Sequence, residues 1–172
     1  MKKIRIAAIS TVLTLAVAAC GGGDISGVSG QLAPDIDPVA SASVERPWSG
    51  ECNVAAAFTG PTTLHITGTC QLAHLGRVSV VAEQTIDPGP SGIGYTNVAT
   101  YTAANGDELR TTNVGVATPT ADGLSLSGTE TAVGGTGRFQ NAAGTAALNG
   151  SVRFTGPSTT IGGYTLSGRL SY

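Results

Sequence analysis

Lysine is almost missing from this chain: Lys2 and Lys3 are the only two, and both lie at the N-terminus. From residue 20 onward the charged residues are six arginines and eleven acidic residues. The absence of lysine excludes a phosphate-binding P-loop, a Schiff-base lysine and a serine–lysine pair from that part of the chain. Because negative charge is in excess, no basic surface is left for a phosphate backbone, and we expect no nucleic-acid partner.

Aromatic residues and histidine are also scarce, at 5% of the chain and two residues respectively. A serine hydrolase is not indicated, because the G-x-S-x-G nucleophile motif is missing. Long amphipathic helices are not indicated either, because no segment keeps a 3.6-residue apolar period. The abundant residues are glycine, with 25 copies, and Thr, Ser, Val and Ala. This composition predicts many short strands joined by tight turns.

The first twenty residues have the layout of an export signal. Positive residues precede the apolar run Ile6–Val17, which is too short to cross a bilayer as a helix. The ending Val17-Ala18-Ala19-Cys20 resembles the lipobox of bacterial lipoproteins, where signal peptidase II cuts before the cysteine that carries the lipid. The resemblance implies a lipoprotein signal peptide at 1–19, lipidation of Cys20, and the membrane as a partner through that anchor. The alternative is an ordinary signal peptide in which Cys20 has no role.

A tether is expected between this signal and the folded domain. Residues 20–46 are rich in Gly, Pro, Ser and Asp, with only isolated aliphatic residues. Such a segment cannot bury enough apolar surface to offset its ordering entropy, so it predicts a flexible linker. The folded domain is expected at 47–172. We expect it in the cell envelope, in the periplasm or at the cell surface, and Gly21 fits sorting of the lipoprotein to the outer membrane.

Eight segments of the domain are predicted to be strands. They are 48–58, 63–71, 76–86, 95–103, 107–118, 124–133, 144–155 and 160–172. Asn105-Gly106 between the fourth and fifth segments predicts a hairpin with a type I′ turn. Since the strands carry one apolar and one polar face, we predict an all-β fold consisting of a single eight-stranded antiparallel barrel. A two-sheet β-sandwich is the alternative.

The two cysteines of the domain are placed symmetrically about the first predicted turn. Cys52 and Cys70 each lie nine residues from Pro61, so a hairpin centred there sets them opposite each other. In an oxidising compartment this arrangement predicts a disulfide. A reactive thiol or a metal-binding pair is the alternative, but neither has a supporting ligand cluster nearby, and we expect no metal and no cofactor.

Glu130 and His74 are the candidate catalytic residues. Glu130 lies an even number of positions from Leu124 and Leu126, so in a strand it has the same parity as they do and its carboxylate lies on the apolar face. An inward carboxylate is a functional candidate because its burial is costly without a partner. The alternative is a bulge near Gly128 that turns Glu130 outward. His74 precedes the third strand and is either an inward group or a structural residue beside Gly76.

A glycine-rich motif carries a family resemblance. Gly134, Gly135, Gly137, Arg138 and Phe139 open a segment that resembles the "GGTGRF..A.G" signature of allene oxide cyclase-like and dirigent-like barrels. Uncharacterised secreted bacterial proteins carry it too. The resemblance extends over 50–170 and implies an eight-stranded barrel with an internal cavity. The family's catalytic residues find no match here. The motif also lacks the third glycine of a dinucleotide loop, so we interpret its glycines as structural, at a corner of the barrel.

Three functions follow from these observations. The first is an outer-membrane-anchored lipoprotein whose barrel binds a small apolar ligand, in a cavity of roughly a few hundred Å³, or serves as a structural or interaction module. It needs no catalytic set, so we expect a binding or structural role before an enzymatic one. The second is an isomerase or cyclase of the allene oxide cyclase type. The third is an integral outer-membrane barrel, because the alternating segment Tyr164–Tyr172 ends on an aromatic residue. The oligomeric state and the identity of the ligand are not encoded in any recognisable pattern.

Overall fold

The computed structural model describes residues 44–90 and 92–172. The predicted signal peptide at 1–19, lipidation at Cys20 and nearly all of the tether lie outside these residues. The first strand begins at Glu45, two positions before the predicted domain boundary. In the part of the chain that is described, the one helical element is a 3₁₀ turn, Gly137–Phe139, and no helix is long and apolar enough to span a membrane.

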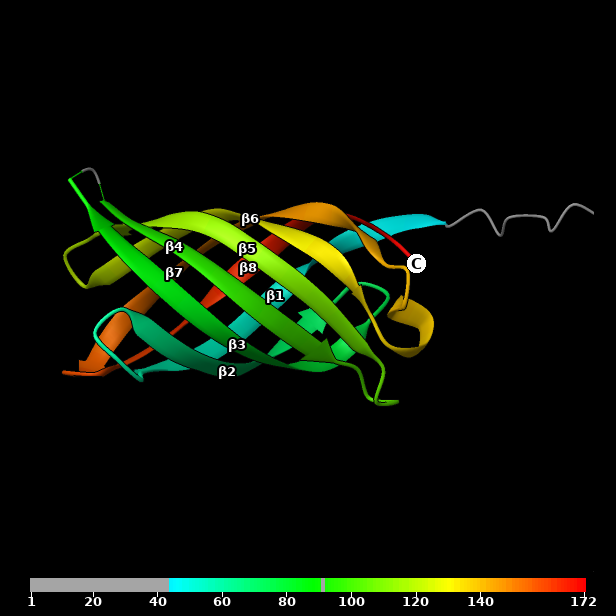
Figure 1. Cartoon of the computed structure of the whole chain (residues 1–172), viewed down its shortest axis with the longest axis horizontal. Helices are drawn as coiled ribbons and strands as arrows, with labels where there is room; N and C mark the ends of the chain where they lie inside the picture. Colours follow the sequence, from blue (N-terminus) through cyan, green and yellow to red (C-terminus); the bar gives the residue numbers. More distant parts are fainter. Residues whose placement is uncertain (1–43, 91) are drawn as a thin grey trace, which may run out of the picture. The chain divides into compact units, whose positions relative to one another are not determined.

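Eight antiparallel strands form one closed barrel (Figure 1). They are β1 (Glu45–Phe58), β2 (Thr63–Leu72), β3 (Gly76–Gly89), β4 (Gly92–Thr102), β5 (Glu108–Pro119), β6 (Gly123–Gly135), β7 (Ala143–Gly156) and β8 (Thr159–Ser171). Each strand pairs with the next along the chain, and β1 pairs with β8. This last pairing closes the sheet and leaves no free edge. The predicted eight-stranded barrel is therefore confirmed, and the sandwich alternative is wrong.

The two-residue alternation of the sequence sets the inside and outside of the barrel. On β7, Ala146 and Leu148 are buried, while Thr145 and Ala147 are exposed. On β8, Leu166 is buried beside exposed neighbours. Successive side chains of a strand point to opposite faces, so most large apolar side chains lie inside, while the outer face carries small polar residues and some valines, such as Val98 and Val114.

The β4–β5 hairpin forms where Asn105-Gly106 predicts it, but its turn type differs from the prediction. Gly106 has φ +86°, whereas Asn105 is not in the left-handed region. The amide of Gly106 donates to the carbonyl of Ala103, and the amide of Ala103 donates to the carbonyl of Asp107. This is a longer loop with a single left-handed glycine, and not a type I′ turn, which needs positive φ at both central residues. The Asn105 side chain instead accepts a hydrogen bond from the Asp107 amide.

One end of the barrel is filled by large side chains. Trp48 and Phe139 are completely buried there, and Phe139 comes from the 3₁₀ turn between β6 and β7. Its ring lies 4.9 Å from the ring of Tyr172, and the Arg138 guanidinium lies over both rings. The predicted glycine-rich motif therefore forms the corner that closes this end, with Gly137 at φ +53°.

Candidate functional site

The opposite end of the barrel contains a cavity. Its volume is about 130 Å³, and side chains from all eight strands line it, most of them aliphatic. Ile66, Leu126 and Leu148 are among those that form the wall. Phe154 also lines it but is 54% exposed, because it stands at the mouth near the β7–β8 turn. The cavity is smaller than the few hundred Å³ expected from the sequence, and its size suits one ring or a short chain.

Glu130 lies inside the barrel, between this cavity and the closed end. It is 1% exposed, and it pairs without a bulge with Asn113 of β5 and Ala146 of β7. The alternative of a bulge near Gly128 is wrong, because the irregularity of the β5–β6 ladder lies at Leu109/Thr111. The parity of Glu130 with Leu126 therefore predicted its inward direction correctly.

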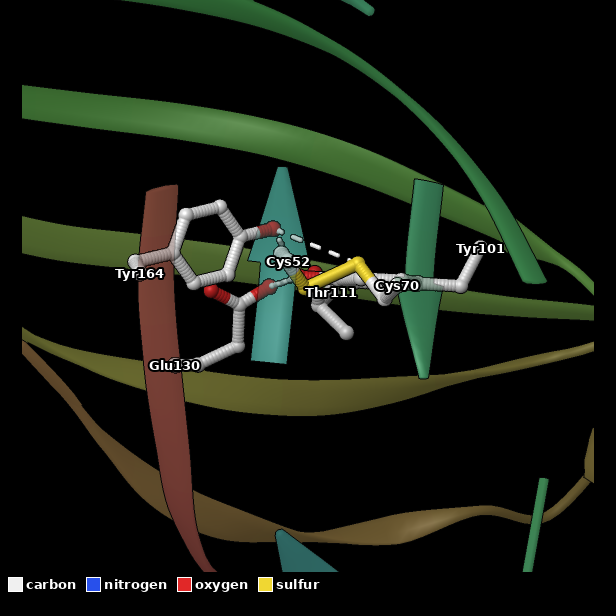
Figure 2. Close-up of a disulfide and its surroundings, with 6 residues drawn as sticks. All are labelled: Cys52, Cys70, Tyr101, Thr111, Glu130 and Tyr164. Carbon is white, nitrogen blue, oxygen red and sulfur yellow. Dashed lines mark hydrogen bonds between the residues drawn. A yellow bond between two sulfur atoms is a disulfide. The ribbon is translucent and has the colours of Figure 1, made fainter. Parts of the chain in front are cut away.

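Three side chains donate hydrogen bonds to the Glu130 carboxylate, and Figure 2 draws two of them, Tyr101 and Thr111. The Tyr101 hydroxyl, 3.1 Å away, and the Thr111 hydroxyl both bond Oε1. The Asn113 side-chain amide bonds Oε2 at 3.0 Å. Burial raises the pKa of the Glu130 carboxyl, and the three donors oppose that rise in part. The carboxyl group is thus partnered, and its protonated form is favoured relative to an exposed glutamate.

A pair of tyrosines connects Glu130 to the cavity. The hydroxyls of Tyr101 and Tyr164 are 2.9 Å apart, and Tyr164 lines the cavity wall. Burial, followed by the nearby Glu130 charge, raises the pKa of Tyr95 to about 12, and burial raises the pKa of Tyr164 as well. The phenols of this site therefore stay protonated at neutral pH, and they offer hydrogen bonds without carrying charge.

The predicted disulfide is confirmed. Cys52 and Cys70 are direct partners in the β1–β2 ladder and are bonded to each other. Both are 2% exposed, so the bond lies inside the barrel. The sulfur of Cys70 is 4.0 Å from the Tyr164 hydroxyl (Figure 2). The disulfide therefore joins the two strands next to the polar cluster around Glu130.

His74 does not join this cluster. It is exposed in the turn between β2 and β3, where its backbone has φ 62°. The inward orientation considered for His74 is therefore wrong, because the turn directs the residue to solvent. His65 also lies outside the barrel, where its ring bonds the exposed Glu83. Within residues 44–90 and 92–172, no three His, Cys, Asp or Glu side chains gather as a metal site.

Several polar residues of the site were missed by sequence reasoning. Tyr95, Tyr101, Thr111 and Asn113 are all buried. Each of them occupies an inward position of its strand, so parity is the signal that could have found them. Parity alone does not show that residues from different strands converge, because convergence depends on the register between the strands.

Comparison with known proteins adds a likeness of fold. The chain matches no protein-family model and no curated protein sequence. Among solved structures, it is similar to the pterocarpan synthase dirigent protein, with 17% identity and a TM-score of 0.48. The alignment covers 83% of this chain and 99% of that protein.

Proposed function

We propose that this chain is a lipid-anchored protein of the bacterial cell envelope whose barrel binds a small apolar ligand. The observation that carries the proposal is the apolar cavity of about 130 Å³ at one end of the barrel. An engineered apolar cavity of about 150 Å³ in another protein binds benzene, so a space of this size takes a ring-sized molecule. The Phe154 side chain at the mouth extends the apolar surface to the outside.

Ligand binding is tested by filling the cavity. Ala56 lines it, whereas its neighbour Ala55 is exposed on the outer face of β1. We expect Ala56→Phe to abolish uptake of a fluorescent apolar probe, and Ala55→Phe, the matched control, to leave it unchanged. Native mass spectrometry of the purified protein should show a bound small molecule in the control but not in Ala56→Phe. If neither the unmodified chain nor the control takes up a probe, the barrel is a structural or interaction module instead.

The anchor is tested separately, because it depends on residues outside the barrel. The lipobox ending Val17-Ala18-Ala19-Cys20 supports it. We expect labelled palmitate to be incorporated into the unmodified chain and lost in Cys20→Ala. We also expect an inhibitor of signal peptidase II to cause the uncleaved precursor to accumulate. Separation of inner and outer membranes on a density gradient tests the sorting, and we expect the protein in the outer-membrane fraction. Incorporation that persists in Cys20→Ala would refute the assignment of the lipid to this cysteine.

An isomerase or cyclase is the second candidate, and one observation favours it. The hydrogen-bonded path from Tyr164 through Tyr101 to the buried Glu130 leads from the cavity to a carboxyl group with a raised pKa. A group of that kind can donate or accept a proton near a bound molecule. Once a substrate is known, Glu130→Gln and Tyr164→Phe should each lower kcat. Turnover that survives both substitutions would eliminate this candidate.

On β7 the direction of the side chains weighs against an integral outer-membrane barrel, although Val98 of β4 and Val114 of β5 are exposed apolar residues. Such barrels present an apolar band outward and a polar interior. On β7 the outward residues include Asn149, Ser151 and Arg153, all exposed, while Leu148 faces the cavity. The outer face of this strand is therefore suited to water.

A further inference from the structure

We infer that the cavity takes an organic cation with an apolar surface, such as a quaternary ammonium group, and that this cation is the counter-ion of the buried Glu130 carboxylate. The inference rests on the proposed function, because it names the class of small molecule that the cavity binds. It starts from a buried acid without a positive partner. Glu130 is 1% exposed, and no Lys, Arg or His among the described residues forms an ion pair with it.

Aromatic rings are concentrated around the cavity. The chain has few of them, three Phe, four Tyr and one Trp. Four of these residues line this one cavity: Phe58, Tyr95, Phe154 and Tyr164. Phe154 at the mouth pairs with Thr160 of β8, and Tyr164 lies four residues further along that strand, about 13 Å deeper at the rise of a β-strand. The rings are therefore distributed from the mouth to the inner end.

The two inner tyrosines present their rings, and not their hydroxyls, to the cavity. The Tyr164 hydroxyl is directed toward the disulfide and bonds the Tyr101 hydroxyl at 2.9 Å (Figure 2). The Tyr95 hydroxyl is buried against the inner wall, where a methyl group on Gly128 would come 2.9 Å from it. The carbon surface of both rings is what remains to line the cavity. The face of an aromatic ring is electrically negative and attracts cations.

The Glu130 carboxylate lies behind these rings, close enough for its charge to act on the cavity. Two successive hydrogen bonds join it to the wall, one of 3.1 Å from Tyr101 to Glu130 and one of 2.9 Å between Tyr101 and Tyr164. Burial and, after it, the Glu130 charge raise the pKa of Tyr95 and of Tyr164. A cation in the cavity would be attracted by the same charge, in surroundings that screen it less than water does.

The rest of the wall suits a quaternary ammonium ion. None of the described residues that line the cavity is Lys, Arg or His, so no like charge repels a cation. Most of them are aliphatic and match the methyl groups that surround the nitrogen. A primary ammonium group would need acceptors for its three N–H donors, and an anion would find no positive partner. The cavity is therefore complementary to a methylated cation more than to either.

Three probes of one shape test the inference: choline, its uncharged carbon analogue 3,3-dimethyl-1-butanol, and the anion 3,3-dimethylbutanoate. The full chain carrying Cys20→Ser, which removes the site of lipid attachment, is isotope-labelled and titrated with each probe by NMR. We expect choline to bind about tenfold more tightly than the neutral analogue, the effect of one charge at roughly 10 Å with an effective dielectric constant of about 20. In a cavity without charge recognition the order would be reversed, because the cation would lose its hydration.

Variants assign the effect to residues. Glu130→Gln keeps the shape and removes the charge, so it should weaken choline binding about tenfold and leave the neutral analogue unchanged. The matched control is Glu51→Gln, whose residue is exposed on β1, and it should keep the preference for choline. Tyr164→Leu should lower that preference severalfold, whereas Tyr164→Phe, which retains the ring, should restore it.

The pH dependence of binding gives a readout that needs no variant. The side chains that bond Glu130 or feel its charge are phenols, a hydroxyl and an amide that stay uncharged at neutral pH: Tyr95 and Tyr101 of β4, Thr111 and Asn113 of β5, and Tyr164 of β8. β7 contributes Ala146, and β1 and β2 contribute cysteines that are joined in the disulfide. Between roughly pH 5 and 8, Glu130 is thus the group of this cluster that changes charge. Choline should bind more tightly as the pH rises through this range, because a bound cation favours the ionised carboxylate, and the neutral analogue should not.

The outcomes separate the two levels of the proposal. If no probe binds, the proposed ligand-binding function fails. If the neutral or the anionic probe binds as tightly as choline or more tightly, the ligand-binding function stands and the inference of a cation is overturned. A preference for choline that is the same in Glu130→Gln, or the same at every pH, would overturn the assignment of Glu130 as the counter-ion.

Discussion

Removal of the internal disulfide is predicted to weaken the barrel strongly. Cys52 and Cys70 are 18 positions apart and are bonded between β1 and β2. In the chain-entropy model, a loop of this length corresponds to about 3 kcal/mol of folding free energy. Both cysteines are 2% exposed, so replacement by alanine also removes buried atoms from the interior beside Tyr164. We therefore expect the double variant Cys52→Ala/Cys70→Ala to lose at least about 3 kcal/mol.

A second variant separates the cross-link from the packing. Cys52→Val/Cys70→Val breaks the same bond but restores side-chain volume, so it should lose about 3 kcal/mol and no more. Urea unfolding followed by circular dichroism measures both, and the melting temperature should fall by roughly 10 °C or more. If the valine pair is as stable as the disulfide-bonded protein, the cross-link does not stabilise the barrel and the entropic reasoning fails. Intact-mass analysis of the unmodified protein with and without reduction confirms that the bond was present.

Three further predictions concern single residues. Glu130→Gln should flatten the pH dependence of stability. Because burial raises the pKa of Glu130 in the folded protein, unfolding releases a proton at pH values above the ordinary glutamate pKa, and the unmodified barrel loses stability as the pH rises through that window. If the free energy of unfolding from urea titrations between roughly pH 4 and 8 changes with the same slope in both proteins, this prediction is contradicted. Phe139→Ala should cost about 3–5 kcal/mol, since this completely buried ring fills the closed end, and a loss below about 1 kcal/mol in urea unfolding would show that the end is not packed as described. His74→Gly should stabilise the protein by up to about 1 kcal/mol by relieving the left-handed backbone at φ 62°, with unchanged probe binding; a loss of binding would return His74 to the site.

The sequence predicted the fold well because the barrel is built from local patterns. Alternation placed all eight strands, and the end positions differ from the structure by a few residues. The spacing of Cys52 and Cys70 about one turn predicted their pairing, which the β1–β2 register confirms. Both inferences need only neighbouring segments, so they do not depend on how the barrel closes.

The site was predicted only in part because it depends on register across the whole barrel. Glu130 was found from its own strand, where its parity with apolar residues is visible. The meeting of Tyr101 from β4 and Tyr164 from β8 was not, because these residues are 63 positions apart and come together only when the barrel closes. The direction of His74 was left open between an inward group and a structural residue beside Gly76. Strand alternation does not apply to a turn residue, and its direction depends on a backbone conformation that composition does not reveal.

The closed end of the barrel has a consequence for how the molecule can be held. β1 enters the barrel at Glu45 and β8 leaves it at Ser171, and these two residues are paired in the ladder at the end that Trp48 and Phe139 fill (Figure 1). The mouth, marked by Phe154, lies at the other end. Glu45 and Ser171 therefore lie at the pole of the barrel opposite the mouth of the cavity. A tag fused at Tyr172 starts at the closed pole, so it leaves the entrance for the proposed ligand at Phe154 unobstructed.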